Sequence, residues 1–181
     1  MRLPDCEKGE PTVKTIAEYV DGLHAKDNQE AYACLKALLA ESENSNAVYP
    51  YFGTFAEMLG SDNSYLRSRG ILLIAANVRW DIDQHMDECI DAYLRHTEDV
   101  KPITARQCIQ ALPAIAKAKP DLVPDILQAL RHVRTYRYRD TMQPLLQQDI
   151  AHAITQIEAL PQQAGIGAQP VNTLSSGVPA P

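Results

Sequence analysis

One stretch of the sequence, from Asp62 to Asp81, constrains the fold more than any other. Capping residues open it between Ser61 and Ser64, and Asp81 with Gln84 marks the start of a following helix. Between these caps, apolar residues occupy nearly every side of a helix: Leu66, Ile71, Leu72, Leu73, Ile74, Ala75, Ala76 and Val78. A helix that is apolar almost all round is covered by other helices on several sides. We therefore predict that this helix is the centre of an all-helical domain.

Helical periodicity continues on both sides of this stretch. We expect eight helices, because no run of alternating apolar residues predicts a strand. The expected helices span about 13–23, 29–41, 48–58, 62–81, 82–96, 102–119, 121–133 and 140–160. The sequence predicts a loose N-terminal lead-in over 1–11, a helical repeat domain over 12–160, and a disordered tail over 161–181. That tail carries no charge and is rich in Pro, Gly, Ser and Gln.

A short pattern recurs at a fixed spacing in the second half of the domain. Ser68-Arg69-Gly70-Ile71-Leu72 is followed 37 residues later by Ala105-Arg106-Gln107-Cys108-Ile109, and a second shift of 37 reaches Met142–Leu146. A period near 40 with two helices per unit is typical of α-helical repeats. In such repeats each helical hairpin leaves an apolar face open, and stacking against the next hairpin buries it.

At Asp62–Asp81 and Lys101–Ile109 the chain resembles the HEAT-like (armadillo-type) α–α superhelix, as in small bacterial cytosolic HEAT-repeat proteins of unassigned function. The resemblance covers about 12–160 and implies a right-handed superhelix of about four antiparallel helical hairpins. HEAT units tend to carry an Asp in the turn and an Arg six residues later, which form a ladder. Arg69 and Arg106 match the Arg, whereas Asn63 and Val100 replace the Asp and the third unit has Gln143. The resemblance implies a scaffold more than a reaction.

Charge is distributed unevenly along this acidic chain, whose formal net charge is −6. Residues 1–60 hold 5 Lys or Arg against 10 Asp or Glu, whereas residues 101–160 hold 8 against 5. An acidic front and a basic back favour directed association over general nucleic-acid binding. Neither a signal-peptide pattern nor a run of about 18 apolar residues occurs, so we expect a cytoplasmic protein. Cys6, Cys34, Cys89 and Cys108 form no CxxC pair and are expected to be reduced thiols.

Equivalent positions of the repeat suggest a candidate binding surface. Arg69, Arg106 and Gln143 are equivalent, and Gln110 and Gln147 follow the last two by four residues. In a superhelix of this kind the second helix of each hairpin lines the concave surface. The row suits the backbone or carboxylates of a protein partner's extended segment. The other interpretation is a ladder that joins neighbouring hairpins and that no ligand reaches.

A basic segment offers a second candidate. Arg131, Arg134, Tyr136, Arg137 and Arg139 lie at the end of the expected seventh helix. Guanidinium groups bind phosphates, and tyrosine rings stack on bases, so the segment could bind an anion or nucleic acid. The plainer interpretation is that cations suit a helix C-terminus and neutralise nearby acids such as Asp140.

Catalytic and metal-binding patterns are weak. Asp81, His85 and Cys89 share one helix face at a spacing that could bind zinc, but Asp81 is better explained as a cap and Cys89 as core. The sequence shows no nucleophile elbow, phosphate loop or paired carboxylate motif, so we expect neither an enzyme nor a cofactor. The sequence therefore predicts a non-catalytic protein–protein interaction scaffold or adaptor that binds a partner segment on its concave surface. The alternative is a nucleic-acid or phosphate-binding helical repeat protein that uses residues 131–139.

Overall fold

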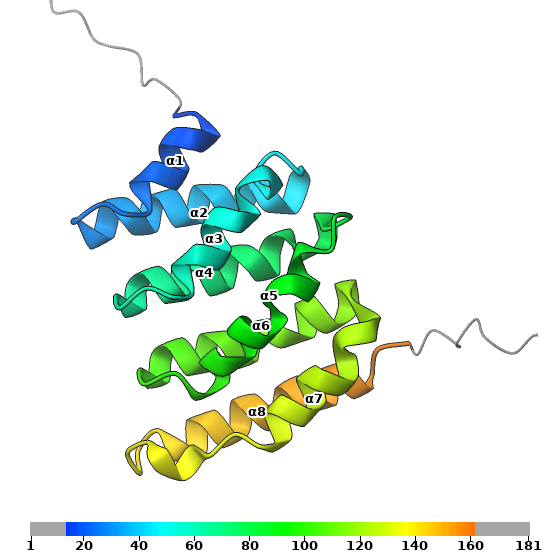
Figure 1. Ribbon diagram of the computed structural model, residues 1–181. Helices are drawn as coiled ribbons and strands as arrows, with labels where there is room; N and C mark the ends of the chain where they lie inside the picture. The colour runs from blue at the N-terminus through cyan, green and yellow to red at the C-terminus, as the bar shows by residue number, and fades with distance from the viewer. Residues whose placement is uncertain (1–13, 162–181) are drawn as a thin grey trace, which may run out of the picture.

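The computed structural model describes residues 14–161, and this part of the chain is all-helical (Figure 1). It contains α1 (Ile16–Gly22), α2 (Asn28–Asn44), α3 (Phe52–Met58), α4 (Ser64–Asn77), α5 (His85–Leu94), α6 (Pro102–Ala118), α7 (Val123–Arg131) and α8 (Gln143–Glu158). Short 3-10 helices join them: η1 (Tyr49–Tyr51), η2 (Val78–Trp80), η3 (Arg95–Glu98), η4 (Pro120–Leu122) and η5 (Thr135–Arg137). The predicted lead-in, Cys6 and nearly all of the predicted tail lie outside the described residues.

Local sequence signals account for several helix starts. The Asp27 side chain accepts a hydrogen bond from the backbone N–H of Gln29 at the start of α2, and Asn63 caps α4 in the same way. Pro102 occupies the first turn of α6, where its missing N–H is harmless. These starts agree with the prediction.

Four predicted helix starts are wrong by three or four residues. Helix α1 begins at Ile16 and not at 13, and α3 begins at Phe52 and not at 48, after the 3-10 helix η1. Helix α5 begins at His85 and not at 82, because Gln84 takes a left-handed backbone conformation with φ 63° and ψ 26°. Asp81 still serves the helix start, since its carboxylate accepts hydrogen bonds from the backbone N–H groups of His85 and Met86. Helix α8 begins at Gln143 and not at 140.

The helices form two layers (Figure 1). Helices α2, α4, α6 and α8 lie side by side in that order, and each contacts the next. Helices α1, α3, α5 and α7 cover one side of this row. Figure 1 also shows the turns gathered along two edges. The hairpin-turn edge holds the turns near residues 23–27, 59–63, 95–101 and 132–142, and the linker edge holds residues 45–51, 78–84 and 119–122.

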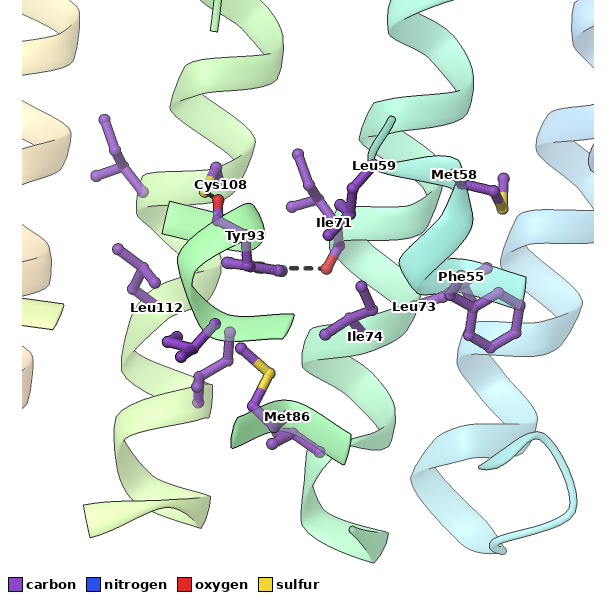
Figure 2. Close-up of a cluster of buried hydrophobic side chains, with 14 of the residues drawn as sticks. Phe55, Met58, Leu59, Ile71, Leu73, Ile74, Met86, Tyr93, Cys108 and Leu112 are labelled. Atoms are coloured by element: carbon purple, nitrogen blue, oxygen red, sulfur yellow. Dashed lines mark hydrogen bonds between the residues drawn. The ribbon is translucent and has the colours of Figure 1, made fainter. Parts of the chain in front are cut away.

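Helix α4 lies at the centre of the core, as predicted (Figure 2). Ile71, Leu73 and Ile74 are fully buried, and the carbonyl of Ile71 accepts a 3.1 Å hydrogen bond from the buried Tyr93 hydroxyl of α5. Gly70 allows α3 to approach closely. A Cβ atom at this position would lie 2.7 Å from the carbonyl oxygen of Phe55. No helix within residues 14–161 has the combined length and apolar character that crossing a membrane requires.

Candidate interaction surface

The predicted row of polar residues does not form one exposed surface, because Arg69 is buried with 6% of its area exposed. Its Nη1 donates a 2.6 Å hydrogen bond to the carbonyl of Leu23 in the α1–α2 turn, and Nη2 contacts Oδ1 of Asn28 at 3.3 Å. Burial lowers the pKa of Arg69 below its usual value. Its assignment as an open binding residue is therefore wrong. Arg69 joins α4 to the start of α2.

Arg106 is engaged with the next helix of the row. Its Nε and Nη2 donate to the two carboxylate oxygens of Asp149 in α8, at 2.5 and 3.3 Å. The amide nitrogen of Gln110 donates to the same carboxylate at 2.8 Å. Asp149 is buried and raises the pKa of Arg106. Arg106 and Gln110 thus link α6 to α8 through Asp149. This geometry fits the second interpretation of the row, a ladder that joins neighbouring hairpins.

Gln143 and Gln147 face a different part of the molecule. The amide nitrogen of Gln143 donates to the carbonyl of Tyr138 at 2.9 Å, and that of Gln147 lies 3.4 Å from the hydroxyl of Thr135. Both partners belong to the α7–α8 turn. These two glutamines therefore do not extend the surface that Arg106 and Gln110 occupy, although the sequence predicted equivalent positions for them.

The basic segment at 131–139 forms ion pairs with neighbouring acids. Arg134 makes a bidentate pair with Glu98 at 2.9 and 2.6 Å, and Nη1 of Arg137 lies 3.5 Å from the same carboxylate. The hydrogen bond from Arg134 is the main cause that lowers the pKa of Glu98 to about 2. Arg131 pairs with Glu158 at 2.8 Å. Three of the four arginines thus already have carboxylate partners.

Tyr136 and Arg139 complete this segment and remain solvent-facing. Tyr136 is 72% exposed, and Arg139 is exposed. The structure therefore brings the five predicted residues to one turn, as their sequence positions require. It surrounds them with acids that compete with any anionic ligand. Asp140, which the sequence offered as the neutralising acid, contacts Gln143 and is not among these ion-pair partners.

Sequence reasoning missed the most buried ion pair, which lies on the hairpin-turn edge. Arg67 donates to both carboxylate oxygens of Asp99, at 2.7 and 2.8 Å, and its Nη1 donates to the carbonyls of Ser61 and Asp62. Burial alone would raise the pKa of Asp99, but Arg67 and the backbone N–H of Lys101 hold it below its usual value. The sequence did hold a clue to a structural role for Asp99. It lies 37 residues after Asp62, which is the spacing of the pattern noted above.

Asp81 holds the linker edge together. Its carboxylate lies 2.8 Å from Nζ of Lys119 and accepts a 2.9 Å hydrogen bond from the Tyr49 hydroxyl. These contacts engage Asp81, the first of the three residues considered for zinc. Burial and the nearby Asp81 raise the pKa of the Cys89 thiol to about 11. Within residues 14–161, no group of three or more His, Cys, Asp or Glu residues is arranged to hold a metal ion.

Each helix of the α2–α4–α6–α8 row exposes one large apolar side chain near its start. The exposed fractions are 57% for Tyr32, 59% for Tyr65, 57% for Ile103 and 37% for Leu145. Tyr65 precedes Gly70 by five residues, so it points about 140° away from the side of α4 that α3 covers. We call the surface of these four helices that is turned away from α1, α3, α5 and α7 the outer face.

The other three side chains belong to the same outer face. Ile103 precedes by five residues the buried Cys108, whose thiol contacts the carbonyl of Tyr93 in α5. Tyr32 precedes Cys34 by two residues, or about 200° of helix, and Cys34 packs against Gly22 of α1. Leu145 lies one turn before Asp149, whose carboxylate accepts a hydrogen bond from Gln110, and Gln110 follows Ile103 by seven residues and so shares its side of α6. The outer face therefore carries an apolar side chain from each of four neighbouring helices.

Charge differs between the two layers. Residues 64–80 and 100–120, which contain α4 and α6, hold no Asp or Glu but seven Lys or Arg. The exposed cations among them are Arg79, Lys101 and Lys117, and Lys36 on α2 lies 5.2 Å from the ring centre of Tyr32. Helices α1, α3, α5 and α7 together carry seven Asp or Glu and one Arg. Helices α4 and α6 thus carry cations and no carboxylate, and the exposed cations lie at or just beyond the ends of these two helices.

Comparisons with known proteins were made for the whole chain. No protein-family model matches it, and searches of the curated proteins and of the solved structures found no match either.

Proposed function

We propose that this protein is a non-catalytic interaction scaffold that binds a segment of a partner protein on its outer face. The observation that carries the proposal is the presence of Tyr32, Tyr65, Ile103 and Leu145, one on each of four adjacent helices. Isolated exposed apolar residues are ordinary, but an ordered row across one face is typical of interaction sites. Tyrosine in particular is enriched in protein–protein interfaces.

The proposal includes the right-handed HEAT-like superhelix, in which second helices of successive hairpins line one surface. The side-by-side packing of α2, α4, α6 and α8 supports this arrangement. Polar links between neighbours support it as well: Arg69 joins α4 to the α1–α2 turn, and Arg106 joins α6 to α8. Links of this kind hold the exposed side chains at set distances, so little conformational freedom is lost when a partner binds.

The alternative function, binding of nucleic acid or phosphate at 131–139, is supported by the exposure of Tyr136 and Arg139. The ion pairs of Glu98 and Glu158 oppose it, because a phosphate would have to displace these carboxylates. Salt separates the two functions. Phosphate contacts make affinity fall by roughly 0.9 log units per neutralised phosphate for each tenfold rise in salt.

Site-specific photo-cross-linking tests the scaffold function. A photoreactive residue is placed at Tyr65 or Ile103 and, as the matched control, at Ile82, which is 87% exposed on the linker edge. Cross-linked proteins from an extract of the source organism are identified by mass spectrometry, and the partner is then purified. We expect the same partner from Tyr65 and Ile103 and not from Ile82.

Binding to the purified partner completes this test. Truncating a central interface side chain commonly weakens binding by about 2 kcal/mol, which is roughly thirtyfold in Kd. Ile103→Ser should therefore weaken binding strongly, whereas Ile82→Ser should leave Kd unchanged. Equal effects of the two substitutions, or cross-links from Ile82 alone, would contradict a binding site on the outer face.

A further inference from the structure

The turn between α7 and α8 holds several hydrogen-bond donors that converge on one carboxylate. Oε1 of Glu98 accepts from the backbone N–H of Arg134 at 2.7 Å and from its Nε at 2.9 Å, and Oε2 accepts from Nη2 at 2.6 Å. Nη1 of Arg137 lies 3.5 Å from the same Oε2. A backbone N–H with two guanidinium groups is a set of donors that also suits the oxygens of a phosphate.

We infer that this turn is a binding site for a dianionic phosphate group, such as a phosphate monoester, and that Glu98 is its internal occupant, which closes the site until a phosphate displaces it. The inference rests on the alternative function given above for residues 131–139, and it does not depend on the outer face. It goes beyond that function because it names the residue that blocks the site, the donors that bind the ligand and the class of phosphate.

Glu98 can leave these donors without a change in the backbone. Its side chain is 22% exposed at the end of η3, so rotation about its own bonds carries the carboxylate into solvent. The neighbouring Asp99 differs, because its side chain is only 3% exposed and accepts hydrogen bonds from both Arg67 and the backbone N–H of Lys101. Asp99 therefore serves the fold, whereas Glu98 is free to act as a gate.

The donors keep their positions when Glu98 leaves, because other contacts hold the turn. The Tyr138 hydroxyl donates to the carbonyl of Asp99 at 2.7 Å, and the carbonyl of Tyr138 accepts from the side-chain amide of Gln143 at 2.9 Å. Two backbone hydrogen bonds close η5 and fix the course of the turn itself. A phosphate therefore finds its donors already in place, so little conformational freedom is lost on binding.

A dianionic phosphate suits this site better than a nucleic-acid backbone does. A phosphate monoester carries a charge near −2 at neutral pH, so its attraction to Arg134 and Arg137 exceeds that of the single charge on Glu98. Each phosphate of a nucleic acid carries one charge, like the carboxylate that it would have to displace. Binding of a nucleic-acid strand also uses a basic groove along several nucleotides, whereas the next arginine toward α7, Arg131, is paired with Glu158.

NMR titration of the full-length chain with inorganic phosphate tests the inference. The readout is the backbone N–H signal of residue 134, followed at constant ionic strength in the wild type and in Glu98→Gln. Removing an internal competitor raises the open fraction of the site, and the apparent Kd falls by the same factor. We expect Kd to fall about fivefold or more, and Arg134→Gln added to Glu98→Gln should remove this gain.

Glu158→Gln is the matched control for charge. It makes the same change in net charge and frees Arg131 from a 2.8 Å ion pair, in which one guanidinium contacts the carboxylate. Phosphate affinity should stay within about twofold of the wild type. Equal gains from the two substitutions would show a general charge effect and overturn the site, as would an unchanged Kd in Glu98→Gln.

Two further ligands distinguish the source and the class of the phosphate. A peptide that carries one phosphoserine should bind Glu98→Gln at least as tightly as inorganic phosphate does, and tighter binding would identify a phosphorylated protein as the source. A single-stranded oligonucleotide that binds more tightly than either would overturn the dianionic class and leave the nucleic-acid alternative in place.

The variants also separate failure of the gate from failure of the alternative function. Phosphate binding that depends on Arg134 but is equal with and without Glu98 overturns only the gate. Absence of binding in every variant contradicts both, and the outer-face scaffold is tested independently by Ile103→Ser. Loss of the NMR signals of residues 132–142 in Glu98→Gln would overturn the inference as well, because Tyr138 is expected to hold the turn.

Discussion

Gly70 provides a direct test of the packing between α3 and α4. A Cβ atom at Gly70 would lie 2.7 Å from the carbonyl oxygen of Phe55 and 3.0 Å from Cβ of Met58. An ordinary contact begins at 3.4 Å, so Gly70→Ala forces α3 and α4 apart by about 0.7 Å at the Phe55 carbonyl. The obstacle is backbone and cannot rotate away. Overpacking of this kind costs about 1–3 kcal/mol.

A matched substitution isolates this cost. Gly53 lies in α3, and nothing stands within 4 Å of where its Cβ would be. Replacing Gly by Ala inside a helix stabilises it by about 0.5–1 kcal/mol, through the same backbone effect at both positions. That gain therefore cancels when the two variants are compared. We expect Gly70→Ala to be less stable than Gly53→Ala by about 1–3 kcal/mol.

Urea unfolding followed by circular dichroism at the helical band measures this difference. In thermal unfolding, each kcal/mol corresponds to about 2–4 °C in Tm for a domain of this size. If Gly70→Ala and Gly53→Ala unfold at the same urea concentration with the same slope, α3 does not press against α4 at Gly70. The central position of α4 would then be wrong.

Two further predictions concern the hairpin-turn edge. Arg67→Met leaves the buried Asp99 carboxylate without its main partner, so urea unfolding should show a loss of about 3–5 kcal/mol in stability. As the control, Arg95→Met at an exposed site should change stability by less than about 0.5 kcal/mol. A loss below about 1 kcal/mol at Arg67 would refute the buried pair. The pKa of Glu98 is about 2 in the folded protein against an ordinary value of 4.5. Its ionised carboxylate therefore stabilises the fold fully above pH 4.5, and this stabilisation is lost as the pH falls from 4.5 toward 2. Tm should therefore fall over this acidic window, and Glu98→Gln should make the fall shallower. An unchanged pH profile in Glu98→Gln would contradict the Arg134–Glu98 pair.

Local features of this fold were predictable from the sequence, and most side-chain partners were not. Apolar periodicity and caps such as Asp27 and Asn63 predicted the helices, because these signals act within a few residues. The late start of α5 was not predictable, because glutamine has no preference for the left-handed conformation that Gln84 adopts. A glycine or asparagine at this position would have indicated it, because these residues adopt the left-handed conformation readily.

The candidate site shows the same division. The sequence predicts that Arg69 and Arg106 are equivalent in a repeat, but their side chains reach opposite neighbours: Arg69 contacts the preceding α1–α2 turn and Arg106 contacts the following α8. The direction depends on whether an acceptor lies before or after each helix. For Arg106 that acceptor is Asp149, which lies 43 residues away in the sequence. It can be identified only once the structure shows that α6 and α8 lie side by side. The exposed row was missed because apolar residues on helices are first assigned to the core.

The ion pairs between neighbouring hairpins limit how this array can change in length. Deleting the segment from α7 to α8 would remove Asp149 and Arg134 together, leaving Arg106 and Glu98 as unmatched charges on the new terminal unit. Inserting a unit between α4 and α5 would likewise separate Arg67 from Asp99. Gain or loss of a unit in such a chain therefore requires compensating substitutions on the units that remain. Its units are individual parts fitted to particular neighbours, and they cannot be exchanged as identical modules.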